Sequence, residues 1–357
     1  MSVFKGKNIS VSIFGQSHSE AIGVTIDGLP AGIRIDDTRI AAFMQRRAPS
    51  ASAFSTSRAE PDVPVFVSGV MNGVTTGAAV TALIYNKDQR SRDYSALYNT
   101  PRPGHADYTA RIKYGGSEDH RGGGAFSGRM TAPFCIAGAI ADGYLRERGI
   151  VTGSHILSVG NVKDAGFDPV SISSEQLDAV TSKPFSVIDD EKGVQMLDLI
   201  ANTRADGDSV GGVIECAAVG VPVGLGGELF DGIESTVARL VFSVPAVKGF
   251  EIGSGFSASE SFGSLNNDEF CYDGDVVRTK TNNAGGILGG ITSGMPIVFR
   301  AAIKPTPSIA KPQHTVDLSA KSEAEITIGG RHDACIVPRA LPVIESCLMI
   351  AVLDEII

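Results

Sequence analysis

Three of the six histidines lie in short polar segments that also carry arginines. His18 lies in FGQSHSEAIG, His105 in PRPGHADYTARIKYG, and the third histidine directly precedes Asp333 in GGRHDACIVPRA. Histidine exchanges protons near neutral pH, and a neighbouring carboxylate supplies a second acid–base group. Arginine binds phosphate and carboxylate through paired hydrogen bonds. These residue types therefore indicate proton-transfer groups gathered around an anionic ligand.

A glycine-rich loop separates two arginines in RGGGAFSGRMTAP, residues 121–133. Arg121 and Arg129 flank three consecutive glycines and Ser127, and an apolar helical segment follows. The first N–H groups of a helix are free to bind anions, and glycine lets the backbone approach a ligand closely. A tight turn with surface arginines explains the same residues equally well, because a glycine pattern on its own is weak evidence.

A lysine and two hydroxyl groups follow an expected strand in AIKPTPSI, residues 302–309, where Lys304 begins the proline-rich part. All these basic segments are expected loops, and loops are where proteins often build their sites. The residues alone predict a site for a small molecule with several negative charges. The sequence contains no HExxH metal motif, Walker loop or GxSxG nucleophile elbow.

Alternating apolar residues and helical periodicity predict the elements that position these loops. The expected strands are 8–14, a strand followed by a turn within 23–32, two strands within 63–86, 150–158, 210–224 and 295–303. The expected helices are 37–47, 132–149 with Thr131 as cap, 188–202, 230–242 and 339–357. Residues 86–131 are expected to form ordered loops and short strands around the site. Strands in hairpins with helices between them favour an α+β fold in a single domain, 1–357.

Composition restricts the class of protein. The net charge of −9 argues against a general nucleic-acid binder, whose affinity comes from Lys and Arg on phosphates. Five widely spaced cysteines without a CxxC pair indicate neither a disulfide framework nor a zinc site, and no metal is expected. The N-terminus lacks an apolar signal region, and no apolar run is long enough to span a bilayer. We expect a soluble cytoplasmic protein with no membrane or nucleic-acid partner.

The same segments resemble the chorismate synthase family over residues 8–357, practically the whole chain. The resemblance rests on ordered matches along the chain: GQSHSEAIGVTIDGLPAG, QRRAP, STSRAEPD, SGVMNGVTTG, NKDQRSRDYS, PRPGHADYT, RGGG, AVKGFEIGSGF, NNAGGILGGITSGMPI, KPTPSI and GRHDACIVPRA. It implies a β-α-β sandwich, with helices between two antiparallel sheets, assembled as a homotetramer.

The resemblance also implies an activity. Members of the family eliminate phosphate from 5-enolpyruvylshikimate 3-phosphate in an anti-1,4 reaction that gives chorismate, the last shared step toward the aromatic amino acids. They need reduced FMN although the reaction is redox-neutral overall. This chain has no GxGxxG dinucleotide loop. We therefore expect an external flavin reductase to supply reduced FMN, with NADPH involved only indirectly.

Site residues follow from the resemblance, motif by motif. His18 would protonate the departing phosphate, His105 would protonate or steady the reduced flavin, and Asp333 would act with the flavin in removing the C6 proton. Ser17 and Ser127 would position these groups. Substrate contacts are expected from Arg47, Arg129 and Arg339. Flavin contacts are expected from Arg47, Ala125, Phe126, Ser127, Pro245, Ala246, Gly289, Lys304, Pro305, Thr306, Pro307, Ser308 and Arg331.

Several positions depart from the commonest family pattern. Ala48 and Ala53 stand where arginines are usual, and Ala125, Phe126 and Met130 replace Arg, Ser and Glu after the glycines. GQSHS replaces GESHG, and RHDA replaces RHDP. The RRAP and FSGR sequences resemble a divergent bacterial branch, in which a histidine takes the place of Ala125. The alternative to an active lyase is a non-catalytic relative that binds flavin or anions, which the alanines would favour.

Overall fold

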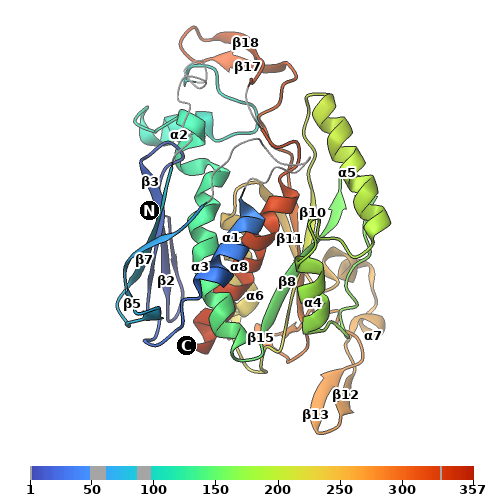
Figure 1. The fold of residues 1–357 in the computed structure, drawn as a ribbon. Helices are drawn as coiled ribbons and strands as arrows, with labels where there is room; N and C mark the ends of the chain where they lie inside the picture. Colours follow the sequence, from blue (N-terminus) through green and yellow to red (C-terminus); the bar gives the residue numbers. More distant parts are fainter. Residues whose placement is uncertain (1, 49–61, 87–97, 330–331) are drawn as a thin grey trace.

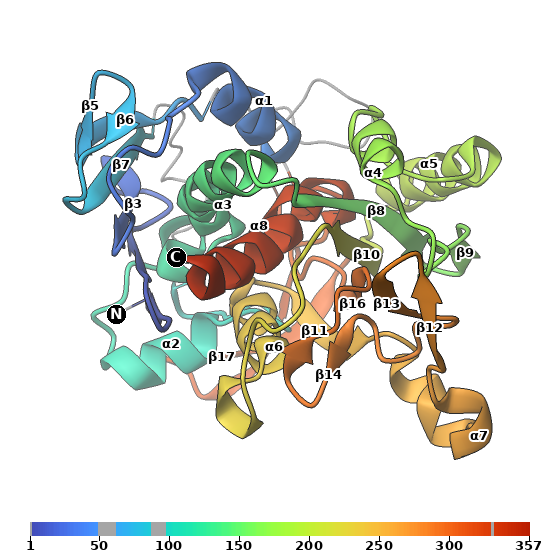
Figure 2. The same ribbon diagram turned by 90° about the horizontal axis from the view of Figure 1, so that it is seen from below.

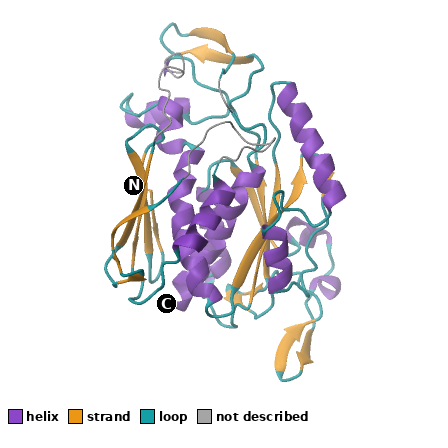
Figure 3. Ribbon diagram, viewed as in Figure 1, coloured by secondary structure: helices purple, strands orange, loops and turns teal. Residues whose placement is uncertain are grey.

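The computed structural model describes residues 2–48, 62–86, 98–329 and 332–357. Two five-stranded antiparallel sheets enclose a layer of helices, as Figures 1 and 3 show from the side and Figure 2 from below. This arrangement confirms the expected α+β sandwich with helices between two antiparallel sheets.

The first sheet has the strand order β1-β2-β3-β7-β4. Its strands are β1 (Ser2–Lys5), β2 (Ser10–Gly15), β3 (Ala21–Asp27), β4 (Val65–Ser68) and β7 (Val80–Tyr85). Alternate residues of β7 are buried, and Ile22 and Val24 of β3 lie on the same side as Val80, each 0% exposed. This period of two places one face of the sheet on the helices and leaves the other toward solvent. The short strands β5 (Val70–Met71) and β6 (Val74–Thr75) pair beside it.

The second sheet has the order β11-β16-β10-β8-β9. Its strands are β8 (Val151–Val159), β9 (Val162–Lys163), β10 (Gly212–Val219), β11 (Val247–Ile252) and β16 (Ile297–Ile303). Almost every residue of β8 is buried, because α4 (Ser174–Thr181) and α5 (Asp190–Ala205) pack on one face and α8 (Val337–Ile356) on the other.

The central layer contains α1 (Asp37–Arg47), α3 (Thr131–Arg146), α6 (Ile233–Ser243) and α8. A helix that other elements surround has no solvent face, and α8 is accordingly buried at every position from Val337 to Asp354 except Arg339. Its polar groups are paired inside the protein. Glu345 accepts two hydrogen bonds from Arg46, at 2.7 and 2.6 Å, and one from Ser154 at 2.6 Å.

The connections carry smaller elements. Near the site these are α2 (Asp107–Tyr114), the 3-10 turns η3 (Arg121–Phe126) and η4 (Gly128–Met130), and the hairpin of β17 (Gln313–Asp317) and β18 (Ser322–Ile326). An arm at the lower right of Figure 1 contains η6 (Gly255–Glu260), α7 (Gly263–Asn266), β12 (Phe270–Asp273) and β13 (Val276–Thr279). The turn η5 (Leu229–Asp231) and the pair β14 (Ile287–Leu288) and β15 (Ile291–Thr292) complete the described elements.

Most predicted elements are present, with three differences. Residues 107–114 form a helix where loops and short strands were expected. The helix ends at Gly115, which has φ +60°, and its eight residues are too few to show a clear helical period. The region 63–86 holds four short strands instead of two. Thr131 does not cap α3; its hydroxyl donates to the carbonyl of Gly128 at 2.6 Å. Among the described helices, none has the length and apolar character that crossing a membrane requires.

Candidate active site

A cavity of about 700 Å³ opens where α3 and α8 begin and where α1 and α6 end. Thr131 and Arg339 bring the N-terminal turns of α3 and α8 to its wall. Two helix N-termini with their free N–H groups and partial positive charge favour an anion there. Of the residues expected from the sequence, the following line the cavity: Arg47, His105, Ala125, Phe126, Ser127, Arg129, Pro245, Ala246, Lys304, Thr306, Pro307, Ser308, Asp333 and Arg339.

The glycine loop lies between the two histidines. Ser17 and His18 are in the turn between β2 and β3, and the Ser17 N–H donates to the carbonyl of Gly124 at 3.1 Å. A Cβ atom on Gly122 would lie 2.2 Å from Cε1 of His18, and one on Gly123 would lie 3.1 Å from Nε2 of His105. Both glycines have φ between +60° and +90°, a region that side chains rarely adopt. Glycine is needed here because both imidazoles approach the loop.

Two buried arginines share one carboxylate on the cavity wall. Arg47 and Arg129 are 4% and 8% exposed, and each forms an ion pair with a different oxygen of Asp62, which is 2% exposed. Arg47 also donates to the Gly128 carbonyl at 2.9 Å. Burial lowers the pKa of the Arg47 guanidinium, and the positive charge of Arg339 lowers it further, whereas Asp62 opposes both effects. The wall therefore concentrates positive charge that an anionic ligand would neutralise.

Arg339 links this cluster to the predicted acid–base residue Asp333. Its Nη1 donates to Oδ2 of Asp333 at 2.5 Å, and its Nε donates to the carbonyl of Arg47 at 3.0 Å. The backbone carbonyl of Asp333 accepts from the hydroxyl of Thr306 at 3.0 Å. Asp333 is thus held from the side chain and from the backbone beside the arginines.

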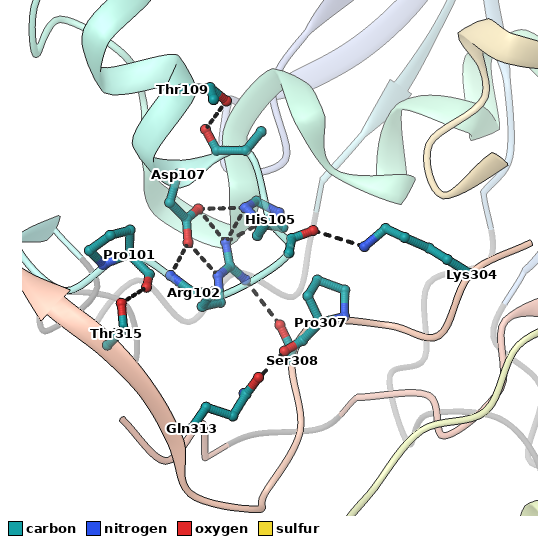
Figure 4. Close-up of polar contacts among 12 residues, drawn as sticks. Pro101, Arg102, His105, Asp107, Thr109, Lys304, Pro307, Ser308, Gln313 and Thr315 are labelled. Atoms are coloured by element: carbon teal, nitrogen blue, oxygen red, sulfur yellow. Dashed lines mark hydrogen bonds and ion pairs between the residues drawn. The ribbon is translucent and has the colours of Figure 1, made fainter. Parts of the chain in front are cut away.

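His105 belongs to a hydrogen-bonded group at the start of α2, drawn in Figure 4. Its Nδ1 lies 2.5 Å from Oδ1 of Asp107, and Arg102 donates to both oxygens of that carboxylate, at 2.7 and 2.8 Å. Arg102 also donates to the hydroxyl of Ser308 at 3.1 Å. Burial alone would raise the pKa of the Asp107 carboxyl, but hydrogen bonds from Arg102 and His105 outweigh it and hold that pKa far below the usual range.

Lysines complete the positive lining. The Lys304 ammonium donates to the carbonyl of Gly104 at 2.8 Å, which ties the end of β16 to the residue before His105. Burial lowers the pKa of Lys304, and the nearby Lys248, also on the cavity wall, lowers it further. An anion bound beside Lys304 would favour the charged form of its ammonium group.

Four expected residues lie elsewhere. Gly289 is exposed in the turn between β14 and β15 and is not in the lining of this cavity, so its expected flavin contact stays a prediction. Pro305 is also outside the lining and packs on Gly211. Ser17 and His18 lie behind the glycine loop, in contact with Gly122. Arg331, like Ala53, falls outside the described residues, so the structure does not place it.

Sequence reasoning assigned no role to four residues of the site, although Arg102 and Asp107 were noted beside His105. The cavity wall includes Arg102 and Lys248, and the carboxylates Asp62 and Asp107 hold its arginines and His105. Signals for them were present, since Arg102 and Asp107 lie in PRPGHAD, Lys248 in AVKGF and Asp62 in STSRAEPD. Nothing in the sequence indicated that Asp62 would meet two arginines distant from it in the chain.

Comparisons with known proteins agree with this geometry. A sequence model of the family "Chorismate synthase" matches residues 9–357. The chorismate synthase of Thermococcus gammatolerans is 46% identical over 99% of this chain and 97% of its own, and that of Korarchaeum cryptofilum is 42% identical over 98% and 96%. The expected bacterial branch stays a prediction.

A solved structure shares the fold. The protein described as "Crystal Structure of Chorismate Synthase" superposes with a TM-score of 0.77 at 28% identity, covering 98% of this chain and 92% of that one. The match therefore includes both sheets, the helix layer and the segments that form the cavity. On the sequence match over residues 9–357 and this shared fold, the chain belongs to the chorismate synthase family.

Proposed function

We propose that this chain forms chorismate by anti-1,4-elimination of phosphate from 5-enolpyruvylshikimate 3-phosphate, with reduced FMN as its cofactor. Its membership of a lyase family over practically the whole chain carries the proposal. The cavity supports it, because the lining gathers four arginines and two lysines beside two helix N-termini. The alternative of a non-catalytic relative is not favoured.

The arginines are the proposed substrate contacts. Arg47, Arg129 and Arg339 lie on one wall, and their charges exceed those of the two aspartates that pair with them. A substrate with a phosphate and two carboxylates would supply the missing negative charge. Since these side chains are already fixed by hydrogen bonds, they would bind the anion with little further ordering.

The acid–base roles are proposed for three groups. His18 would protonate the departing phosphate, with Ser17 beside it at Gly122. Asp333, which Arg339 orients, would receive the C6 proton. His105 would hold a proton at the ring edge that faces Gly123, and Ser127, whose hydroxyl accepts from the Arg129 N–H at 3.2 Å, would position that loop.

The cavity fits a flavin phosphate and ring. Reduced FMN would supply an electron to the breaking C–O bond and recover it afterwards. Ala125 and Phe126 present an apolar edge for the ring, and Lys304, Thr306 and Ser308 present polar groups around it. Pro245, Ala246 and Pro307 would complete the contact.

We further propose a homotetramer with an external flavin reductase as its partner. Phe256, Phe262 and Tyr272 on the projecting arm are 80%, 77% and 79% exposed, which supports burial of the arm against other copies. Light scattering would measure the oligomeric state. All five cysteines are free thiols, in keeping with a cytoplasmic location.

The test is chorismate formation under strict anaerobiosis from 5-enolpyruvylshikimate 3-phosphate and chemically reduced FMN. Turnover is expected without NADPH. His105→Ala should lower turnover by about 10²–10⁴-fold while FMN still binds, the usual contribution of a general acid–base group. If the wild-type protein binds FMN without forming chorismate, the non-catalytic alternative is correct. Ala125→His would then test whether the lost side chain is the reason.

A further inference from the structure

Asp107 makes a contact with His105 that restricts where the imidazole proton can be. Oδ1 of Asp107 lies 2.5 Å from Nδ1 of His105. The carboxylate also accepts from the backbone N–H and from Nε and Nη2 of Arg102, at 3.0, 2.7 and 2.8 Å. These bonds hold the pKa of Asp107 far below its usual range, so its oxygens accept and do not donate.

Two descriptions of His105 compete, because Nη2 of Arg102 also lies 3.0 Å from Nδ1. If Nδ1 were the acceptor of that guanidinium, its lone pair would face an ionised carboxylate oxygen at 2.5 Å, where two acceptors repel each other. If Nδ1 carries the proton, the same contact is a short charge-assisted hydrogen bond. The 2.5 Å distance therefore favours a proton on Nδ1.

We propose that Asp107 is a positioning residue that keeps the proton of His105 on Nδ1, so that Nε2, beside the glycine loop, is the nitrogen that gains and loses a proton. Arg102 fixes the carboxylate, and Ser308 holds Arg102 from the other side at 3.1 Å. The role of His105 in turnover rests on the proposed function, whereas the position of its proton does not.

Fixed groups surround the imidazole ring of His105. Arg102 is 6% exposed, so its ion pair with Asp107 is shielded from solvent. Lys304 bonds the carbonyl of Gly104, directly before His105. A Cβ atom on Gly123 would lie 3.1 Å from Nε2, so the loop backbone can approach this nitrogen closely only because residue 123 is glycine. Nδ1 faces the Asp107 carboxylate, whereas Nε2 faces the loop that borders the cavity and lies 3.3 Å from Nη2 of Arg102.

Nuclear magnetic resonance of protein labelled with ¹⁵N at histidine tests the proposal directly. The His105 signals are assigned by their loss in His105→Gln, and spectra are recorded over the pH range in which the protein is folded. The wild type should keep Nδ1 protonated throughout, with any deprotonation at Nε2. Loss of the proton from Nδ1 would overturn the proposal, and this measurement needs no variant of Asp107.

Asp107→Asn tests the consequence. Oδ2 accepts two bonds from Arg102, so the amide oxygen should take that place and the amide nitrogen should face Nδ1. The proton then moves to Nε2, and kcat should fall about 100-fold with little change in KM, as expected when a general acid–base group is wrongly oriented. Thr109→Ala, which removes a hydroxyl bond to the Ala106 carbonyl on the same helix, is the matched control and should keep both properties.

These measurements distinguish the proposed position of the His105 proton from the proposed function of the protein. If kcat falls in Asp107→Asn while Nδ1 remains protonated, the residue acts only structurally and the proposal is wrong. If wild-type protein forms no chorismate although Nδ1 is protonated as expected, the proposed function is wrong and the placement of the proton is upheld.

Discussion

Asp62 is the carboxylate that the buried guanidiniums of Arg47 and Arg129 share, and replacing it by asparagine removes their common negative charge. The backbone of Asp62 has φ +48°, a conformation that asparagine adopts at least as readily. Asp62→Asn therefore changes the charge with little effect on shape or backbone strain.

The expected loss of stability follows from burial. Removing one partner of a buried ion pair costs about 3–5 kcal/mol, because the remaining charge is left without compensation. An unfolding entropy of about 2.1 cal/mol/K per residue makes 1 kcal/mol equal to roughly 1.3 °C for a chain of 357 residues. The variant should then melt about 4–7 °C below the wild type.

Thermal unfolding at fixed protein concentration, with and without inorganic phosphate, measures this loss. Phosphate should stabilise Asp62→Asn more than the wild type, because an anion in the cavity replaces the missing carboxylate. Asp27→Asn, an exposed aspartate that bonds the Gly28 N–H, is the control and should change little. A melting temperature for Asp62→Asn within about 1 °C of the wild type would refute the assignment of a buried, charge-concentrating cluster.

Two more perturbations test the loop and the second sheet. Gly122→Ala should abolish most turnover and lower stability, because its Cβ would lie 2.2 Å from Cε1 of His18 at φ +60°; normal kinetics would contradict the packing. The pKa of buried His155 is raised: burial alone would lower it, but hydrogen bonds to Asp164 and Glu215 prevail. Its stabilisation is complete below an unfolded pKa of about 6.5 and is lost as pH rises through the higher folded value, so the stability gap between wild type and His155→Gln should narrow from pH 6 to 9.

Local patterns were enough to predict the central helices and most long strands. The strand expected at the start of 23–32 and the helix expected over 339–357 correspond to β3 and α8, because the burial of a strand or of a whole helix shows in the pattern of consecutive residues. The α2 helix escaped prediction since eight residues with one buried position, Ala110, show no clear period. Short elements of this kind depend on packing that the sequence does not display.

The candidate site likewise contains residues that local motifs predicted and contacts that depend on packing. Sequence motifs were enough to name the candidates for the chemistry: the histidines at 18 and 105, Asp333, the flanking arginines and the glycine loop. The fold was needed to show that Asp62 joins Arg47 to Arg129, that Gly122 and Gly123 separate the histidines, and that Gly289 is not in the cavity lining. The physical reason is that chemical identity is local, whereas charge compensation and close contact depend on where distant segments meet.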